Sequence, residues 1–300
     1  MRLPVPEIAP RVQFASCGDM ELAYETFGAT DNPPLVLVMG LATQMLGWPD
    51  EFCESLADGD FHVVRFDNRD IGLSTHLHEA GMPDLSPLFV GQPITSAPYT
   101  LADMADDTIG LVDALGLGRV HLVGASMGGM IAQEVALRHP ERLLSLTSIM
   151  STTAPTVGAP TPEANAVLFS PPATTESEAA ERAITVYQVI GSPGHPLDEV
   201  ALSARAQESF RRANDPAGVA RQLAAIHISG DRTERLRELD VPTLVLHGED
   251  DPLVQVDGGR ATAAAVPGAR LVTWSGMGHD LPRGMWPIII EEITNHAALA

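Results

Sequence analysis

The sequence contains no lysine, so its 18 basic residues are all arginines. This absence excludes three chemistries: a Schiff base on a lysine, the lysine of a phosphate-binding loop and a lysine acting as general base. Cysteine is nearly absent as well, with only Cys17 and Cys53. Two cysteines are too few for a disulfide scaffold, and this pair has no metal-binding spacing. We therefore expect both thiols to be free.

A long apolar run is also lacking. No stretch approaches the roughly 18 apolar residues that a membrane-spanning helix needs. Residues 1–14 contain Pro4, Pro6 and Pro10 and have no continuous apolar segment of the kind found in a secretory signal. These observations predict a soluble cytoplasmic protein that does not enter a membrane. Secretion by a route without a recognisable signal is the alternative.

Positive charge is scarce, because 39 acidic residues face 18 basic ones and the net charge is −21. Such a chain repels polyanions, which argues against binding to nucleic acid or to an anionic membrane. The acidic excess favours a role in solubility over adaptation to salt. We expect a small-molecule partner, and the sequence leaves monomer and homodimer open.

The 45% hydrophobic content of the 300 residues is ample for a core. Apolar runs bounded by turn residues alternate with helical patterns, and two alternating segments at the start predict a hairpin. The predicted strands are 12–17, 21–27, 35–39, 62–66, 120–123, 143–150, 243–247 and 270–274. The predicted core helices are 49–57, 100–116, 127–139, 255–265 and 285–299. This order predicts an α/β fold with a mostly parallel, doubly covered sheet and an N-terminal antiparallel hairpin.

The alternation is interrupted once. Residues 151–172 are rich in Thr, Ala and Pro and predict a loop, and helical patterns then follow without strands at 177–190, 198–212 and 216–228. We therefore expect a core formed by residues 1–150 and 238–300, with residues 151–237 inserted as a helical cap.

The pentapeptide at residues 124–128 reads Gly-Ala-Ser-Met-Gly and lies between a predicted strand and a predicted helix. In that setting it indicates a nucleophile elbow, a sharp turn that holds the Ser126 hydroxyl clear of the backbone. The glycines at either end leave room for so tight a turn. Ser126 is the predicted nucleophile.

A serine nucleophile needs a base, and the base needs an orienting acid. Both are expected at the carboxyl ends of later strands. His279 follows the strand 270–274 and is the predicted base. Asp251 follows the strand 243–247 and is the predicted acid, while Asp250 and Glu249 remain alternatives.

The oxyanion hole is expected to combine the backbone N–H groups of Met127 and Leu41. Gly40, before the second donor, lets the backbone approach the substrate. An apolar substrate pocket is predicted from side chains around these loops, with filling of an ordinary core as the competing interpretation. The candidate pocket residues are Gly40, Met45, Trp48, Met127, Phe169 and Met277.

Two further segments are interpreted as structural. Residues 67–74 alternate charges around a glycine turn and predict an ion-paired loop with no catalytic role. His76 and His78 have metal-binding character, but the segment lacks the further ligands of a closed site, so we predict no metal.

The chain resembles the α/β-hydrolase superfamily over nearly its whole length. The resemblance is carried by the elbow and by residues 37–40, 47–52, 67–74 and 276–279. Within it, the chain is similar to actinobacterial serine esterases and lipases, including the methyl esterases of aclacinomycin. The resemblance implies a Ser/Asp/His hydrolase with a helical cap and no cofactor. Met39 stands where many relatives have the histidine of a His-Gly pair, and Asp70 where many have glycine.

These inferences predict a serine hydrolase that cleaves a small or medium uncharged carboxylic ester through an acyl-enzyme. The same triad also supports cleavage of a thioester, lactone, amide or carbon–carbon bond, or perhydrolysis. A hypothesis of another class is a non-catalytic ligand-binding module on a hydrolase scaffold.

Overall fold

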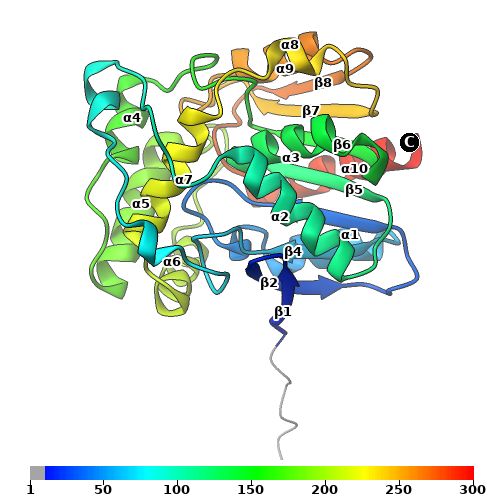
Figure 1. Ribbon diagram of the computed structural model, residues 1–300, viewed down its shortest axis with the longest axis horizontal. Helices are drawn as coiled ribbons and strands as arrows, with labels where there is room; N and C mark the ends of the chain where they lie inside the picture. Colours follow the sequence, from blue (N-terminus) through cyan, green and yellow to red (C-terminus); the bar gives the residue numbers. More distant parts are fainter. Residues whose placement is uncertain (1–10) are drawn as a thin grey trace, which may run out of the picture.

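The computed structural model describes residues 11–300, so the proline-rich start of the chain lies outside the described residues. It contains one eight-stranded sheet in the order β1-β2-β4-β3-β5-β6-β7-β8 (Figure 1). The first two strands form an antiparallel hairpin, β2 pairs antiparallel with β4, and the remaining pairs are parallel. The strands are β1 (Gln13–Cys17), β2 (Met20–Phe27), β3 (Pro34–Val38), β4 (His62–Phe66), β5 (Val120–Ala125), β6 (Leu143–Ile149), β7 (Thr243–Gly248) and β8 (Arg270–Trp274). The predicted fold class is confirmed.

Helices cover both faces of this sheet. The core helices are α1 (Asp50–Asp58), α2 (Leu101–Ala114), α3 (Met127–Arg138), α9 (Asp257–Ala265) and α10 (Trp286–Ala298). Every residue of β4 and β5 is buried. These strands are mostly apolar because a strand covered on both faces has no solvent-facing side, although they also bury His62, Arg65 and His121.

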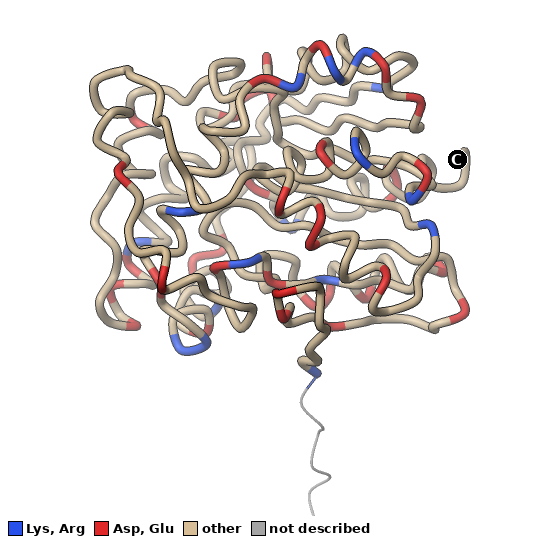
Figure 2. Tube along the Cα trace, in the orientation of Figure 1, with Lys and Arg blue, Asp and Glu red and all other residues tan. Residues whose placement is uncertain are grey.

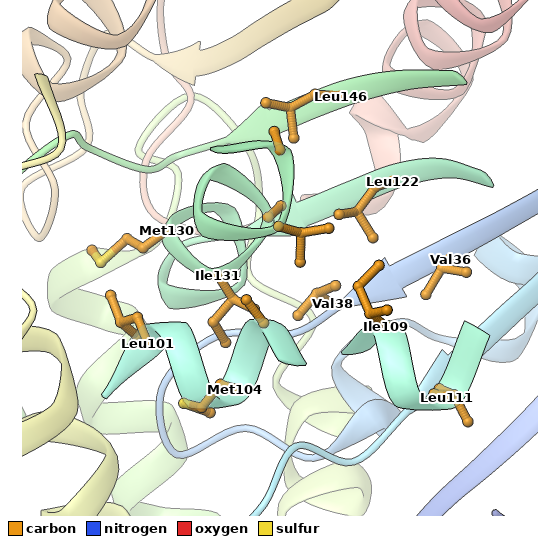
Figure 3. Packing of buried hydrophobic residues seen from close by; sticks show 14 of the residues in the cluster. Val36, Val38, Leu101, Met104, Ile109, Leu111, Leu122, Met130, Ile131 and Leu146 are labelled. Carbon is orange, nitrogen blue, oxygen red and sulfur yellow. The ribbon is translucent and has the colours of Figure 1, made fainter. Parts of the chain in front are cut away.

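The buried side chains form two clusters. One joins α2 and α3 to the sheet, and Figure 3 shows Leu101 of α2 and Ile131 of α3 between the two helices. The other cluster contains side chains of α1 and α10, such as Phe52 and Ile289. Burying these apolar surfaces contributes roughly 25 cal/mol per Å² removed from water, so both helical layers are anchored to the sheet.

The start of α2 shows how local sequence sets a boundary. The Thr100 side chain accepts a hydrogen bond from the Asp103 N–H, and the Asp103 carboxylate accepts one from the Thr100 N–H. This reciprocal capping box satisfies donors that the first helical turn leaves free. The predicted start at Thr100 is therefore confirmed.

Five helices lie between β6 and β7 in sequence: α4 (Pro162–Leu168), α5 (Glu176–Ile190), α6 (Glu199–Arg212), α7 (Pro216–Ile228) and α8 (Thr233–Leu236). In Figure 1, α4, α5 and α6 lie together at one end of the sheet, and α7 runs from them toward the core. The predicted loop at 151–172 is wrong in part because it contains α4. Thr161 caps that helix, Pro162 occupies its first turn and Ala164 is buried, so capping and packing outweigh the loop-like composition.

Short 3₁₀ segments complete the described chain: Met45–Gly47, His78–Ala80, Ser86–Val90, Pro140–Arg142 and Arg283–Met285. Acidic positions are spread over the core and the inserted helices (Figure 2). Within residues 11–300, no helix has both the length and the apolar character needed to cross a bilayer.

Candidate active site

Ser126 lies at the junction of β5 and α3 with a strained backbone, φ 56° and ψ −122°. A residue other than glycine rarely adopts a positive φ, so the surrounding structure must hold this turn in place. Space for it depends on the flanking glycines. A Cβ at Gly124 would lie 2.1 Å from the Gly128 carbonyl oxygen, and one at Gly128 would lie 2.1 Å from the Val38 oxygen. The strand-turn-helix context predicted for the elbow is therefore present.

Three predicted residues from distant segments form a continuous series of contacts. The Ser126 Oγ lies 3.0 Å from His279 Nε2, and His279 Nδ1 lies 2.7 Å from Asp251 Oδ2. Asp251 and His279 are 3% and 8% exposed, so the series is shielded from solvent. A carboxylate only accepts hydrogen bonds, so Nδ1 carries the proton and the Nε2 lone pair faces the serine hydroxyl.

Both oxygens of Asp251 are used. Its Oδ1 accepts hydrogen bonds from the backbone N–H groups of Leu253 and Val254, each at 2.9 Å. These bonds leave Oδ2 directed at the imidazole. Nearby, His247 contacts the Val254 oxygen through Nε2 at 2.7 Å. Burial lowers the pKa of His247, against the opposing field of the Asp251 carboxylate.

The two alternative acids point elsewhere. Asp250 Oδ2 accepts a hydrogen bond from the Gly276 N–H at 2.6 Å, and Glu249 Oε1 accepts one from the Thr273 hydroxyl at 2.9 Å. The first contact supports the loop that precedes the histidine, and the second is made to β8. Asp251 is thus the carboxylate that the fold brings to His279.

The two expected oxyanion donors belong to the segments that border Ser126. The Met127 N–H belongs to the first turn of α3, where a helix offers no internal acceptor. The loop after β3 passes close to Ser126, because a Cβ at Gly40 would lie 3.0 Å from the Ser126 Cβ and 3.5 Å from its Oγ. Leu41 follows Gly40 in this loop. Asn68 supports the shape of this loop, because its Nδ2 donates to the Met39 oxygen at 2.9 Å.

The end of α5 holds the histidine loop, which sequence reasoning missed. The His279 N–H donates to the Ile190 oxygen at 2.7 Å, and the Gly278 N–H donates to the Ser192 Oγ at 2.9 Å. Ser192 in turn donates to Asp280 Oδ1. Burial raises the pKa of Asp280, against the hydrogen bond from Ser192 that lowers it.

The segment after α5 and the histidine loop approach each other too closely for side chains between them. A Cβ at Gly278 would lie 2.3 Å from the Gly191 oxygen, and the Gly194 N–H donates to the Gly276 oxygen at 2.9 Å. The spacing of glycines around residue 278 is visible in the sequence, but their partner segment is not. The position of His279 therefore depends on the inserted helices as well as on the core.

Residues 67–74 form the ion-paired loop that the sequence predicts. Arg212 of α6 pairs with Asp67 at 2.9 Å, and Arg221 of α7 pairs with Asp70 at 2.8 Å. The loop thereby ties both inserted helices to the end of β4. Asp70 adopts a positive φ of 65°, and its two oxygens accept from Arg221.

The predicted pocket residues divide into two groups. Gly40 and Met127 border Ser126. Trp48 and Met277 are fully buried in the cluster shared with Phe52, and Met45 is fully buried as well, whereas Phe169 is partly buried with its ring 4.9 Å from that of Phe89. A role for these four side chains in substrate binding stays a prediction.

One cluster of potential metal ligands lies outside the triad. His76 and His78 meet Asp215, which directly precedes α7, and their ligand atoms all lie within 4.8 Å of one another. The sequence showed the two histidines but not the third ligand, which is more than a hundred residues away along the chain.

Fold and site together define a hydrolase of the serine-nucleophile type, and the family comparison agrees. A model of the alpha/beta hydrolase fold matches residues 33–282, so the chain belongs to that family. The resemblance expected from the sequence is confirmed.

The chain is also similar to individual members of this family along nearly its whole length. The chain is 28% identical to rhodomycin D methylesterase DauP of Streptomyces sp. strain C5, over 94% of this chain and 96% of that protein. It is 27% identical to rhodomycin D methylesterase DnrP of Streptomyces peucetius over the same shares. Among solved structures, a hydrolase from Pseudomonas aeruginosa PA01 is 26% identical, with a TM-score of 0.69 and coverage of 97% of this chain and 100% of that one.

Proposed function

We propose that this protein is a serine hydrolase that cleaves a small or medium uncharged carboxylic ester through an acyl-enzyme. The observation that carries the proposal is the hydrogen-bonded series from Ser126 through His279 to Asp251. The similarity to two methylesterases favours an ester of a small alcohol. The net charge of −21 favours an uncharged substrate over an anionic one.

In the proposed mechanism, Ser126 attacks the ester carbonyl while His279 Nε2 takes the hydroxyl proton. Asp251 keeps the imidazole in the required tautomer and stabilises the imidazolium that forms. The N–H groups of Met127 and Leu41 bind the oxyanion, an interaction worth roughly 3–4 kcal/mol for one donor in a serine hydrolase. His279 then protonates the leaving alcohol and activates a water molecule to release the acid.

The strained backbone of Ser126 supports this assignment. A non-glycine residue at φ 56° costs of order 1–3 kcal/mol and persists only where the fold enforces it. Here the strain aims the hydroxyl at His279, which is the geometry that nucleophilic attack needs.

The experiment is a screen of p-nitrophenyl esters of increasing acyl length, with labelling by a fluorophosphonate. We expect ester turnover with a preference for shorter chains and one covalent adduct for each chain, located on Ser126. Matched thioesters and amides would be cleaved more slowly. Absence of both turnover and adduct on the folded protein would instead support the ligand-binding module.

The proposal also assigns a role to the inserted helices: residues 151–237 act as a helical cap over a core of residues 1–150 and 238–300. The support is the contact between the end of α5 and the histidine loop, together with the ion pairs from α6 and α7 to the loop after β4. The cap thereby positions His279 and is not only a cover.

Ser192 provides the test. Ser192→Ala removes the acceptor for the Gly278 N–H and the donor to Asp280, so His279 loses part of its support. We expect kcat for a p-nitrophenyl ester to fall about tenfold, with a smaller change in KM, because a small displacement of a catalytic group is costly.

Asp280→Asn is the matched conservative variant, since its amide oxygen still accepts from Ser192. It should retain more than half of the activity. Equal activity in Ser192→Ala and the native protein would contradict a positioning role for the end of α5.

A further inference from the structure

Three side chains with metal-binding atoms converge where the loop after β4 meets the inserted helices. His76 Nδ1 lies 2.8 Å from Asp215 Oδ2, and His78 Nδ1 lies 3.7 Å from the same oxygen. The two imidazole rings are stacked with their centroids 5.3 Å apart. Two imidazoles and a carboxylate form a ligand set typical of zinc and related transition metals.

Both ring nitrogens of His76 face oxygen atoms that accept hydrogen bonds. Its Nε2 lies 3.0 Å from the carbonyl oxygen of Gly72, which can only accept, so Nε2 carries a hydrogen. In a neutral ring Nδ1 then presents a lone pair to the Asp215 carboxylate oxygen at 2.8 Å. Two acceptors at that distance repel each other unless a proton or a metal ion joins them.

The local charges lead to the same conclusion. Arg221 also contacts Asp215 Oδ2, at 3.1 Å, but this buried guanidinium is already paired with both oxygens of Asp70 at 2.8 Å. One arginine therefore faces two carboxylates. A further positive charge beside Asp215 would balance the group, because uncompensated charge is costly away from water.

The geometry and access suit a metal ion. Ligand atoms at the corners of a tetrahedron around zinc are about 3.3 Å apart, given bonds of about 2.0–2.1 Å. The observed separations from Asp215 Oδ2, 2.8 and 3.7 Å, lie on either side of this value. His78 is 72% exposed and borders a hollow of about 540 Å³, so an ion and its water ligands can enter without unfolding. The carbonyl behind His76 Nε2 orients the ring as the outer partners of metal-bound histidines do.

We propose that His76, His78 and Asp215 bind one divalent transition-metal ion, with Zn²⁺ as the best match. The ion joins the loop after β4 to the start of α7 and so fastens the inserted helices to the core. It lies outside the triad, and the proposal does not depend on the proposed function.

The test is equilibrium dialysis of the untagged full chain against Zn²⁺ with His78→Asn as the main variant. His78 is exposed, so its replacement removes a ligand without disturbing the core. We expect one Zn²⁺ for each chain and at least about tenfold weaker binding in His78→Asn. The control is His139→Asn. His139 contacts the Asp106 carboxylate at 3.1 Å, but among the described residues this pair belongs to no group of three potential metal ligands.

Thermal unfolding gives a second readout. Zn²⁺ at about a hundred times its Kd should raise the Tm of the native protein by roughly 5 °C, and that of His78→Asn far less. Retained binding in His279→Ala would separate this site from the triad. Failure to bind Zn²⁺ stoichiometrically, or equal binding in the native protein and His78→Asn, would show that a proton alone occupies the site and would overturn the proposal.

Discussion

Ser126→Ala is expected to lower kcat for ester hydrolysis by about 10⁶-fold and to abolish labelling by a fluorophosphonate. Alanine has no oxygen to attack the carbonyl, and His279 then has no proton to accept. The residual rate above the uncatalysed reaction would come from the oxyanion hole and substrate binding, as in other serine hydrolases whose nucleophile is removed.

A nearby serine supplies the control. Ser151 Oγ donates to the Ser126 carbonyl oxygen at 2.8 Å but does not belong to the triad. Ser151→Ala removes a buried hydroxyl from the elbow and should keep kcat within about tenfold of the native value, since it loses one hydrogen bond of modest net worth. Steady-state kinetics on one p-nitrophenyl ester compare the variants. Substantial turnover by Ser126→Ala would remove Ser126 from the role of nucleophile.

Asp251→Asn is expected to lower kcat by about 10⁴-fold, a magnitude known from the equivalent change in a serine protease. The cause is the direction of hydrogen bonding. The Leu253 and Val254 N–H groups both need an acceptor at Oδ1, so the amide oxygen stays there and the amide nitrogen faces His279. The imidazole then accepts at Nδ1 and carries its proton on Nε2, where it cannot take a proton from Ser126.

Asp250→Asn is the matched control, with the same chemical change one residue earlier. Its side-chain oxygen can still accept from the Gly276 N–H, so we expect a loss of kcat of less than about tenfold. Circular dichroism and the Tm of both variants show whether each is folded. A larger effect at Asp250 than at Asp251 would reassign the orienting acid.

Much of the core was predictable because its signals are local. The largely apolar strands β4 and β5, and the Thr100 cap of α2, follow from patterns within a few residues. The location of the proposed nucleophile, acid and base at one edge of the sheet was predictable, because parallel strands place their carboxyl ends together.

The inserted region was less predictable. Helices α4, α5 and α6 each bury only one or two apolar side chains, and α4 lies in a segment whose Thr, Ala and Pro content is typical of a loop. The support that Ser192 gives to the histidine loop also left no signal, because a serine after a helix is common and its partners are 86 and 88 residues away.

The sequence by itself determined the class of fold, the elbow at Ser126 and the two loops that carry Asp251 and His279. Only the tertiary structure selected Asp251 over its neighbours, placed the end of α5 against the histidine loop and brought Asp215 to His76. The physical reason is that strands, caps and turns arise from interactions between near neighbours in the chain. Hydrogen bonds between distant loops depend on how the packed elements orient those loops, which local residue patterns do not encode.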